Sequence, residues 1–417
     1  MNRNLIVKNA AQLVTCKGFT AKKGEAMSDL GIIENGGVLI LDGKITAVGP
    51  SHEVTKGINE KEITVIDAAG KAVIPGFVDS HTHFVFGGYR PDEFAWRLRG
   101  DSYMDIMNRG GGIANSVGAT RKASLDELLV VGTRRLDSML SFGVTTVEGK
   151  SGYGLDRKTE LKQLEAMARL NKSHALDIAP TFLGAHAVPT EFKGKTDEFV
   201  DHVMEILPEV KEKGLAEFCD IFCEENVFSV DQSRRLLVRA KELGLGVKIH
   251  ADEIVQLGGT ELAAELGAVS ADHLLQASEQ GIRDLAASGT VATLLPGTAF
   301  SLKEDYAQGR SMIDHGCAVA LATDFNPGSC FSNSIPLIYA LACLYMKLSP
   351  EEALTALTIN GAAAVGRADT IGSIDVGKQG DLVILEYPSY RFIPYHVGVN
   401  TVETVIKTGK IVFSKKL

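Results

Sequence analysis

The chain has 417 residues, of which 45% are hydrophobic and 23% charged, and its formal net charge is −9. This composition is typical of a globular protein with one large domain and a smaller one, and the interspersed, acidic charge argues against nucleic acid or an anionic membrane as a partner. The six cysteines are scattered without a CxxC pair, and the N-terminus lacks the apolar core of a signal peptide, so we expect a cytoplasmic protein.

Both ends of the chain contain strand and hairpin signals. The run GVLILDGKITAVG (37–49) consists of two short apolar segments around an Asp-Gly pair, which tolerates the positive φ that a tight hairpin requires. Near the other end, GDLVILEY (380–387) and TVETVIKTGKIVF (401–413) have the same pattern. We therefore expect residues 1–74 and 366–417 to combine into one small β-sandwich domain.

The middle of the chain, residues 75–365, alternates between short apolar runs and amphipathic stretches of helical period. Most of the runs are nearly continuous and rich in β-branched residues, as expected of strands that are buried on both faces. Eight strands alternating with helices predict an α/β fold, a (β/α)8 TIM-like barrel, with a doubly wound open sheet as the alternative. No GxGxxG follows the first strand, which disfavours the nucleotide-binding form of that alternative. The eight runs are AVIPGFVDSHTHF, GVTTVEGK, LDIAPTFLGAH, CDIFCEE, GVKIHADE, VSADHL, VATLLPG and AVALATDF.

Polar side chains gather where the predicted strands end. Five of the ten histidines lie there, together with several carboxylates and a lysine. Barrel enzymes carry their chemistry at this C-terminal rim. A single such histidine would be an ordinary core or loop residue, but five at matched strand ends favour a common site. The set is Asp79, His81 and His83; Glu148 and Lys150; His186; Glu224 and Glu225; His250, Asp252 and Glu253; His273; and Asp324.

Four of these residues have the arrangement of a metal site. His81 and His83 are two residues apart in an extended segment, so their imidazoles project from the same face, with Asp79 as a further possible partner. His250 ends the fifth strand, and Asp324 ends the eighth, which lies beside the first once the barrel closes. Three neutral imidazoles and a carboxylate suit zinc and, with less discrimination, ferrous iron or manganese. A water bound to such an ion ionises near neutral pH.

Two segments of the chain resemble the amidohydrolase superfamily. PGFVDSHTH (75–83) is similar to its first-strand signature, and GSIDVGKQGDLVIL (372–385) is similar to the segment in which the chain returns to the small β domain. In that superfamily a second metal usually needs a bridging carboxylated lysine or a glutamate, commonly at the end of strand four. Strand four here ends in IFCEE, and Lys150 lies on strand two. We therefore expect one divalent metal ion, Zn or Fe, with Glu224 as the residue that could hold a second.

Narrower motifs resemble a family of cyclic-amide hydrolases of histidine degradation, which open the ring of 4-imidazolone-5-propanoate to give N-formimidoyl-L-glutamate. The motifs are HTHFVFGGYRPDEF (81–94), EGKSGYGL (148–155), FLGAHAVP (182–189), KIHADE (248–253) and ATDFNPGS (322–329). The resemblance implies a set of metal ligands, namely His81, His83, His250 and Asp324. It also implies a set of substrate contacts, namely Arg90, Tyr153, His186, Glu253, Asn326, Gly328 and Ser329.

The chemistry of these residues agrees with such a substrate. A carboxylate tail calls for a guanidinium, and Arg90 lies in the first loop over the rim, although a solvated loop arginine would have the same spacing. Tyr153 is flanked by glycines, which suits a flexible loop that presents a phenol; a packed loop aromatic is the alternative. Asn326-Pro327-Gly328-Ser329 is a turn sequence in any fold, and its place after Asp324 suggests backbone groups aimed at the ligand.

Proton transfer has three candidate residues. Attack on the ring carbonyl creates an oxyanion, and the departing ring nitrogen needs a proton. We assign Glu253 to proton delivery and to substrate orientation. His273 would accept a proton from the attacking water or steady the oxyanion, and Asp324 could share the role of base.

Two other functions are compatible with the same sequence. Another mononuclear amidohydrolase, such as a different cyclic-amide hydrolase or a purine or pyrimidine aminohydrolase, would share the metal residues, but a neutral base needs no guanidinium such as that of Arg90. A catalytically silent scaffold would be expected to have lost ligands, and all four are present. The expected partners are a small-molecule substrate and, in a homodimer, a second copy of the chain, without nucleic acid or membrane.

Overall fold

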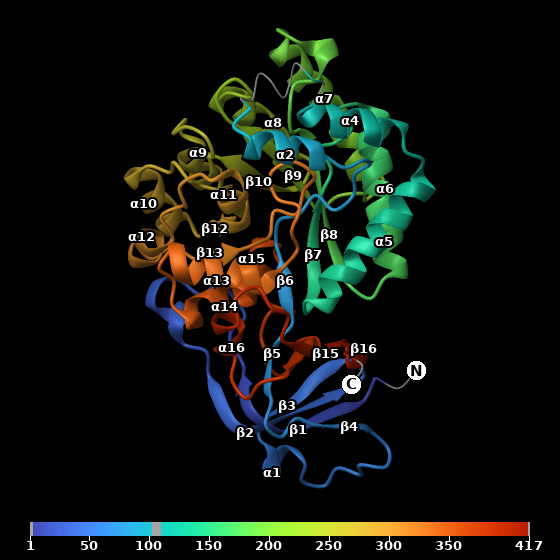
Figure 1. Cartoon of the computed structure of the whole chain (residues 1–417), viewed down its shortest axis with the longest axis vertical. Coiled ribbons are helices and arrows are strands. Elements are labelled where there is room, and N and C mark those ends of the chain that lie inside the picture. The colour runs from blue at the N-terminus through green and yellow to red at the C-terminus, as the bar shows by residue number, and fades with distance from the viewer. Residues whose placement is uncertain (1–2, 102–108, 110, 416–417) are drawn as a thin grey trace.

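The computed structural model describes residues 3–101, 109 and 111–415, which form two separate sheets with helices packed around the larger one (Figure 1). The larger sheet contains β6 (Phe77–Asp79), β7 (Val144–Lys150), β8 (Asp177–Ala185), β9 (Phe218–Cys223), β10 (Gly246–Ala251), β11 (Ser270–His273), β12 (Val291–Leu294) and β13 (Val319–Leu321). Its strands are parallel, and each pairs with its neighbour in the sequence. Because almost all of their residues are buried, these strands have the continuous apolar character of strands covered on both faces.

The first and the last of these strands are joined just beyond their ends. Thr82 and Phe325 form a parallel bridge. The backbone N–H of Asp324 donates to the carbonyl of His81 at 3.0 Å. The N–H of His83 donates to the carbonyl of Phe325 at 2.9 Å. These contacts close the sheet and confirm the predicted (β/α)8 barrel, and they place two predicted metal-binding segments side by side.

Amphipathic helices cover the outside of the barrel. One of them, α5 (Leu125–Ser141), begins at a capping box in which Ser124 and Glu127 exchange hydrogen bonds, and it buries Leu128 and Leu136. In the described part of the chain no helix is both long enough and apolar enough to cross a membrane. The other helices are α1 (Ser51–Val54), α2 (Pro91–Leu98), α4 (Ile113–Lys122), α6 (Arg157–Ser173), α7 (Thr196–Glu212), α8 (Val230–Glu242), α9 (Gly259–Leu266), α10 (Glu279–Ser288), α11 (Pro296–Leu302), α12 (Gly309–Asp314), α13 (Ile335–Tyr345), α14 (Pro350–Leu357), α15 (Ile359–Ala364) and α16 (Phe392–Tyr395), with the 3-10 helices η1 (Gly24–Ser28) and η2 (Thr190–Phe192).

The second sheet is mixed and is built from both ends of the chain. It contains β1 (Leu5–Val14), β2 (Ile32–Leu41), β3 (Lys44–Pro50), β4 (Thr64–Asp67), β5 (Ala72–Pro75), β14 (Leu382–Leu385), β15 (Val402–Lys407) and β16 (Lys410–Ser414). The strand order is β16-β15-β14-β5-β1-β2-β3, with β4 beside β1, and Figure 1 shows this sheet below the barrel with both chain ends next to it. The two predicted hairpins are confirmed, and they turn at Asp42-Gly43 (φ 50° and 81°) and Thr408-Gly409 (φ 47° and 74°).

A single glycine separates the two sheets. The run AVIPGFVDSHTHF is divided between β5 in the small sheet and β6 in the barrel, with Gly76 between them. The backbone N–H of Gly76 donates to the carbonyl of Asp381 at 3.0 Å. A Cβ at this position would overlap the side chain of Thr145 on β7, so any larger residue here would force Thr145 or the backbone to shift.

Candidate active site

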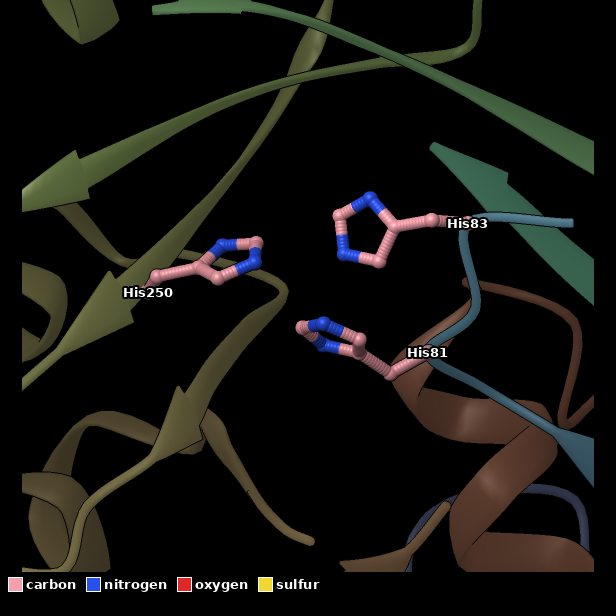
Figure 2. Close-up of side chains that lie close together, drawn as sticks. All are labelled: His81, His83 and His250. Carbon is pink, nitrogen blue, oxygen red and sulfur yellow. The ribbon is translucent and has the colours of Figure 1, made fainter. Parts of the chain in front are cut away.

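Three buried histidines face one another at the C-terminal ends of the barrel strands (Figure 2). His81 and His83 follow β6, and His250 lies in β10; one nitrogen from each ring lies within 4.8 Å of the others. Asp324, which follows β13, joins this group, since its Oδ1 lies 3.5 Å from His81 Nε2 and 3.8 Å from His83 Nε2. The structure thus brings the four residues expected as metal ligands together from three parts of the barrel.

The backbone turns sharply where two of the strands end. Asp324 has a φ of 50° and His273 a φ of 77°, in a left-handed region that residues with a side chain rarely adopt. Such conformations persist where the surroundings hold them, and Thr298 Oγ1 donates to Asp324 Oδ2 at 2.5 Å. The turns direct both side chains toward His81. The ring centroids of His81 and His273 lie 5.4 Å apart.

Two aspartates that sequence reasoning missed hold the histidine rings. Asp272 Oδ2 lies 2.7 Å from His81 Nδ1, and Asp220 Oδ2 lies 3.0 Å from His250 Nδ1. Contacts of this kind fix the orientation of a ring and leave its other nitrogen for a metal ion. The sequence does contain a sign of these two aspartates. Each is a carboxylate inside a buried strand, in CDIFC and in SADH, where an unpaired charge would be costly.

Two buried lysines balance the negative charges of Asp220, Asp272 and Glu148. Lys150 Nζ lies 2.7 Å from Asp220 Oδ2 and 3.2 Å from Asp272 Oδ2, and Lys248 Nζ donates to Glu148 Oε2 at 2.6 Å. Burial alone would lower the pKa of Lys150, but the surrounding carboxylates together raise that pKa above its ordinary value. Lys150 is therefore a charged ion-pair partner here and not the neutral amine from which a metal-bridging carbamate forms.

Glu224, the residue that could have held a second metal, instead binds backbone N–H groups. The carboxylate of Glu224 accepts hydrogen bonds from the backbone N–H groups of Glu225 and of residues 253–255, at 2.8 to 3.3 Å. His81, Glu148 and Asp272 also lie close enough together to bind a metal ion. The ammonium groups of Lys150 and Lys248, however, already contact Glu148.

The histidine cluster fits a divalent ion. Burial lowers the pKa of His81 and of His83 well below the ordinary range, so both rings are neutral and each can offer a lone pair. His81 Nε2 is buried and has no hydrogen-bond partner in the described part of the chain, and such an atom is costly unless something binds it. Three imidazoles and a carboxylate are donors that suit zinc or ferrous iron.

Glu253 reaches the same region through a turn after β10. The strand continues to Ala251, and Asp252 then adopts a φ of 49°. The carboxylate of Asp252 accepts hydrogen bonds from the backbone N–H groups of residues 257–260, at 2.8 to 3.2 Å, which holds the turn in place. Because the chain reverses here, Glu253 lies on the side of the cavity instead of on the opposite face of the strand.

The surroundings of Glu253 favour its protonated form. Its Oε2 lies 3.6 Å from His273 Nδ1. Burial, together with the negative charges of Asp324 and Glu224, raises the pKa of Glu253 to about 8. The carboxyl group is therefore able to donate a proton at neutral pH.

Arg90 is held in place by a buried glutamate. Its Nε donates to Glu93 Oε2 at 2.8 Å, and its Nη2 lies 2.6 Å from the same oxygen. A Cβ at Gly328 would overlap the Arg90 guanidinium, so the glycine makes room for it. Among the residues that the structure describes, Glu93 is the carboxylate that pairs with Arg90, which leaves the other edge of the guanidinium for a further partner.

Tyr153 and His186 form a wall beside His83. The rings of His83 and His186 stack with centroids 4.9 Å apart, and Tyr153 meets both edgewise. Of the two alternatives for this loop, the structure favours a packed aromatic, because Tyr153 is buried and backbone N–H groups on both sides of it donate to Glu160. Burial lowers the pKa of His186 to about 3, and its Nδ1 lies 3.1 Å from the carbonyl of Gly152, so the neutral ring keeps Nε2 as an acceptor.

The turn after Asp324 also differs from expectation. The backbone N–H groups of Gly328 and Ser329 both donate to Asn326 Oδ1 at 2.8 Å, and Asn326 Nδ2 donates to Ser329 Oγ at 2.7 Å. Asparagine commonly binds its own backbone in this way. These N–H groups are therefore used within the turn and are not aimed at a ligand, although the three residues line the cavity.

A cavity of about 460 Å³ lies next to the histidine cluster, because two of its lining residues reach that cluster: His186 stacks on His83, and Glu253 lies 3.6 Å from His273. A cavity of this size, with a few polar groups converging on it, suits a small polar molecule. Its wall includes Arg90, Tyr153, His186, Glu253 and Asn326.

The chain matches the model of the amidohydrolase family over residues 72–412. Together with the closed barrel and the histidine cluster at its rim, this match defines the class: the chain belongs to the amidohydrolase family.

Curated relatives narrow the assignment within that family. The chain is 63% identical over 413 residues to the imidazolonepropionase of Clostridium tetani, which covers 99% of both proteins. It is 61% identical over 411 residues to the imidazolonepropionase of Parabacteroides distasonis, which covers 98% of this chain and 99% of the relative. Within the amidohydrolases, the chain is a member of the imidazolonepropionase family.

Solved structures share the fold at low identity. An adenosine deaminase from Xanthomonas campestris with bound zinc is 18% identical, with a TM-score of 0.71 over 98% of this chain and 92% of that chain. A guanine deaminase from C. acetobutylicum is 17% identical, with a TM-score of 0.71 over 98% of this chain and 100% of that chain. At these identities the likeness establishes the fold alone.

Proposed function

We propose that the protein hydrolyses the ring amide of 4-imidazolone-5-propanoate to give N-formimidoyl-L-glutamate in histidine degradation. The observation that carries this proposal is one cavity in which an arginine and a protonated carboxyl group lie beside a histidine cluster suited to a metal. The name of the curated relatives, imidazolonepropionase, supports the same reaction.

We propose that one divalent ion, zinc or iron, is held by His81, His83, His250 and Asp324. When bound, it lowers the pKa of a coordinated water toward neutrality and so supplies hydroxide. The contacts of Lys150 and of Glu224 with other groups support a single ion rather than two.

Several residues of the cavity wall are assigned to substrate binding. Arg90 pairs with the propionate through the guanidinium edge that Glu93 leaves open. Tyr153 stays a phenol, because burial raises its pKa, and donates a hydrogen bond. His186 Nε2 accepts one from a ring N–H. The turn that contains Asn326, Gly328 and Ser329 borders the substrate.

The proton transfers are assigned to three side chains. Glu253, protonated below its raised pKa of about 8, delivers a proton to the departing ring nitrogen and orients the ring. Burial lowers the pKa of His273 well below its ordinary value, so the neutral ring can accept the proton of the attacking water or steady the oxyanion. Asp324 shares the role of base.

A substrate panel tests this proposal. Purified, metal-supplemented protein should convert 4-imidazolone-5-propanoate to N-formimidoyl-L-glutamate and leave adenosine, guanine and cytosine unchanged. Turnover of one of these bases without turnover of the imidazolone would make the protein an aminohydrolase. No turnover of any compound by metal-loaded protein would support the scaffold function.

Cellular location and assembly stay predictions. We propose a cytoplasmic homodimer; all six cysteines are free thiols, as expected in a reducing compartment. Analytical ultracentrifugation of the purified protein measures the assembly, and a monomer at micromolar concentration would contradict it.

A further inference from the structure

Two arginines lie on one wall of the active-site cavity. Arg90 precedes α2 and Arg97 lies near its end; a separation of seven residues, two helical turns, puts them on the same side. The guanidinium groups of both arginines lie against Gly328. Arg97 Nη2 donates to the Gly328 carbonyl at 2.8 Å, and the Arg90 guanidinium fills the space that a Cβ at Gly328 would need. The wall therefore holds two guanidinium groups close together.

The charge of only one of these arginines is balanced. Glu93, whose side chain is 4% exposed, contacts Arg90 through two nitrogens, so this pair carries no net charge. Asp101 also lines the cavity, but it lies 2.6 Å from Arg109. Within residues 3–101, 109 and 111–415, no ion pair joins a carboxylate to Arg97. Among the described residues of this wall, Arg97 is therefore a cation without a directly paired carboxylate.

We propose that Arg97 is a specificity-determining residue, which supplies the net positive charge that attracts the carboxylate tail of the substrate. Arg90, balanced by Glu93, contributes directed hydrogen bonds to the same tail. This inference rests on the proposed function, because it needs a substrate with a carboxylate. Partial burial and the nearby Arg90 charge lower the pKa of Arg97 by more than the charge of Glu93 raises it, and a bound carboxylate would oppose the repulsion from Arg90. A charge beside a cavity of low polarity acts more strongly than one in open solvent.

The test compares two substrates of nearly the same shape, one with a charged and one with a neutral side chain. One is the imidazolone with its propionate, and the other carries a neutral propionamide. Arg97→Gln should lower kcat/KM for the acid by about 5- to 30-fold, and for the amide by less than about 2-fold. Arg97→Lys keeps the charge and should retain most of the preference for the acid.

A matched control and a second variant make the test decisive. Arg99→Gln removes a positive charge from the end of the same helix, but its side chain is 64% exposed and does not line the cavity, so both substrates should be unaffected. An equal fall for acid and amide in Arg97→Gln would overturn the inference, since it would reflect only the contact with Gly328. So would unchanged kinetics, or an Arg97→Lys variant without preference for the acid. Failure of the wild-type protein to hydrolyse either compound would refute the proposed function instead.

Discussion

At the scale of single residues, Glu253 carries the clearest prediction. Glu253→Gln keeps the shape of the side chain but removes its proton, so kcat should fall by roughly 10²- to 10⁴-fold with metal content unchanged. A carboxyl group with a pKa of about 8 is protonated below that pH, so wild-type kcat/KM should decline as pH rises through about 8. The variant should lack this limb. Elemental analysis and a pH profile are the measurements. Loss of metal in the variant would make Glu253 a metal ligand or an anchor of the metal site, and a fall of less than about tenfold would move the proton transfer to His273 or Asp324.

Arg90 carries a second prediction at this scale. Arg90→Ala should lower kcat/KM by roughly 30- to 1000-fold, which corresponds to the loss of one charge-assisted pair with the substrate. Arg90→Lys should recover only part of the loss, because an ammonium cannot make a planar two-point contact. The alanine variant also leaves Glu93 buried without its partner, so its melting temperature should fall. Unchanged steady-state kinetics would remove Arg90 from the site.

At the scale of elements, the sequence was most informative where burial imposes a pattern. Seven of the eight barrel strands lie within predicted apolar runs and β9 begins one residue before its run, because strands covered on both faces need continuous hydrophobic residues. The Asp-Gly hairpin was predictable because its turn demands a positive φ. The division of one run at Gly76 was not, since it depends on the approach of Thr145, which lies 69 residues further along the chain.

The junction between the two sheets gives a prediction of its own. Gly76→Ala places a methyl group against Thr145, and we expect it to lower the free energy of unfolding by about 1–3 kcal/mol, as overpacking does. Gly118→Ala is the control: it lies inside α4 with open space around it and should stabilise the protein by about 0.5–1 kcal/mol. Urea denaturation measures both, and equal stability of the two variants would argue against close contact at Gly76.

At the scale of the whole molecule, a buried ion network ties the barrel strands together beneath the histidines. Lys150 on β7 joins Asp220 on β9 to Asp272 on β11, and these two aspartates contact His250 and His81. Sequence reasoning found the histidines because they stand at strand ends. It missed the aspartates because their role depends on neighbours from other strands, which only the closed barrel brings together.

Removing the centre of this network should weaken both fold and site. Lys150→Met leaves buried carboxylates without a counter-charge, and the free energy of unfolding should fall by about 3–5 kcal/mol. Lys195→Met removes a lysine that is 57% exposed and pairs with Glu198 three residues on, so it should cost no more than about 1 kcal/mol. Denaturant titration of the two variants side by side is the measurement, and similar losses would show that the network contributes little.

We propose that one metal ion, held at the histidine cluster, supports ring-opening hydrolysis in this cavity. The most direct test removes metal with a chelator, adds zinc or ferrous iron in steps, and follows formation of N-formimidoyl-L-glutamate from 4-imidazolone-5-propanoate. Activity should be absent in the stripped protein, rise linearly, and reach its plateau at about one equivalent per chain. The His81→Ala protein should stay inactive throughout. A plateau at two equivalents, or full activity in the stripped protein, would contradict the account.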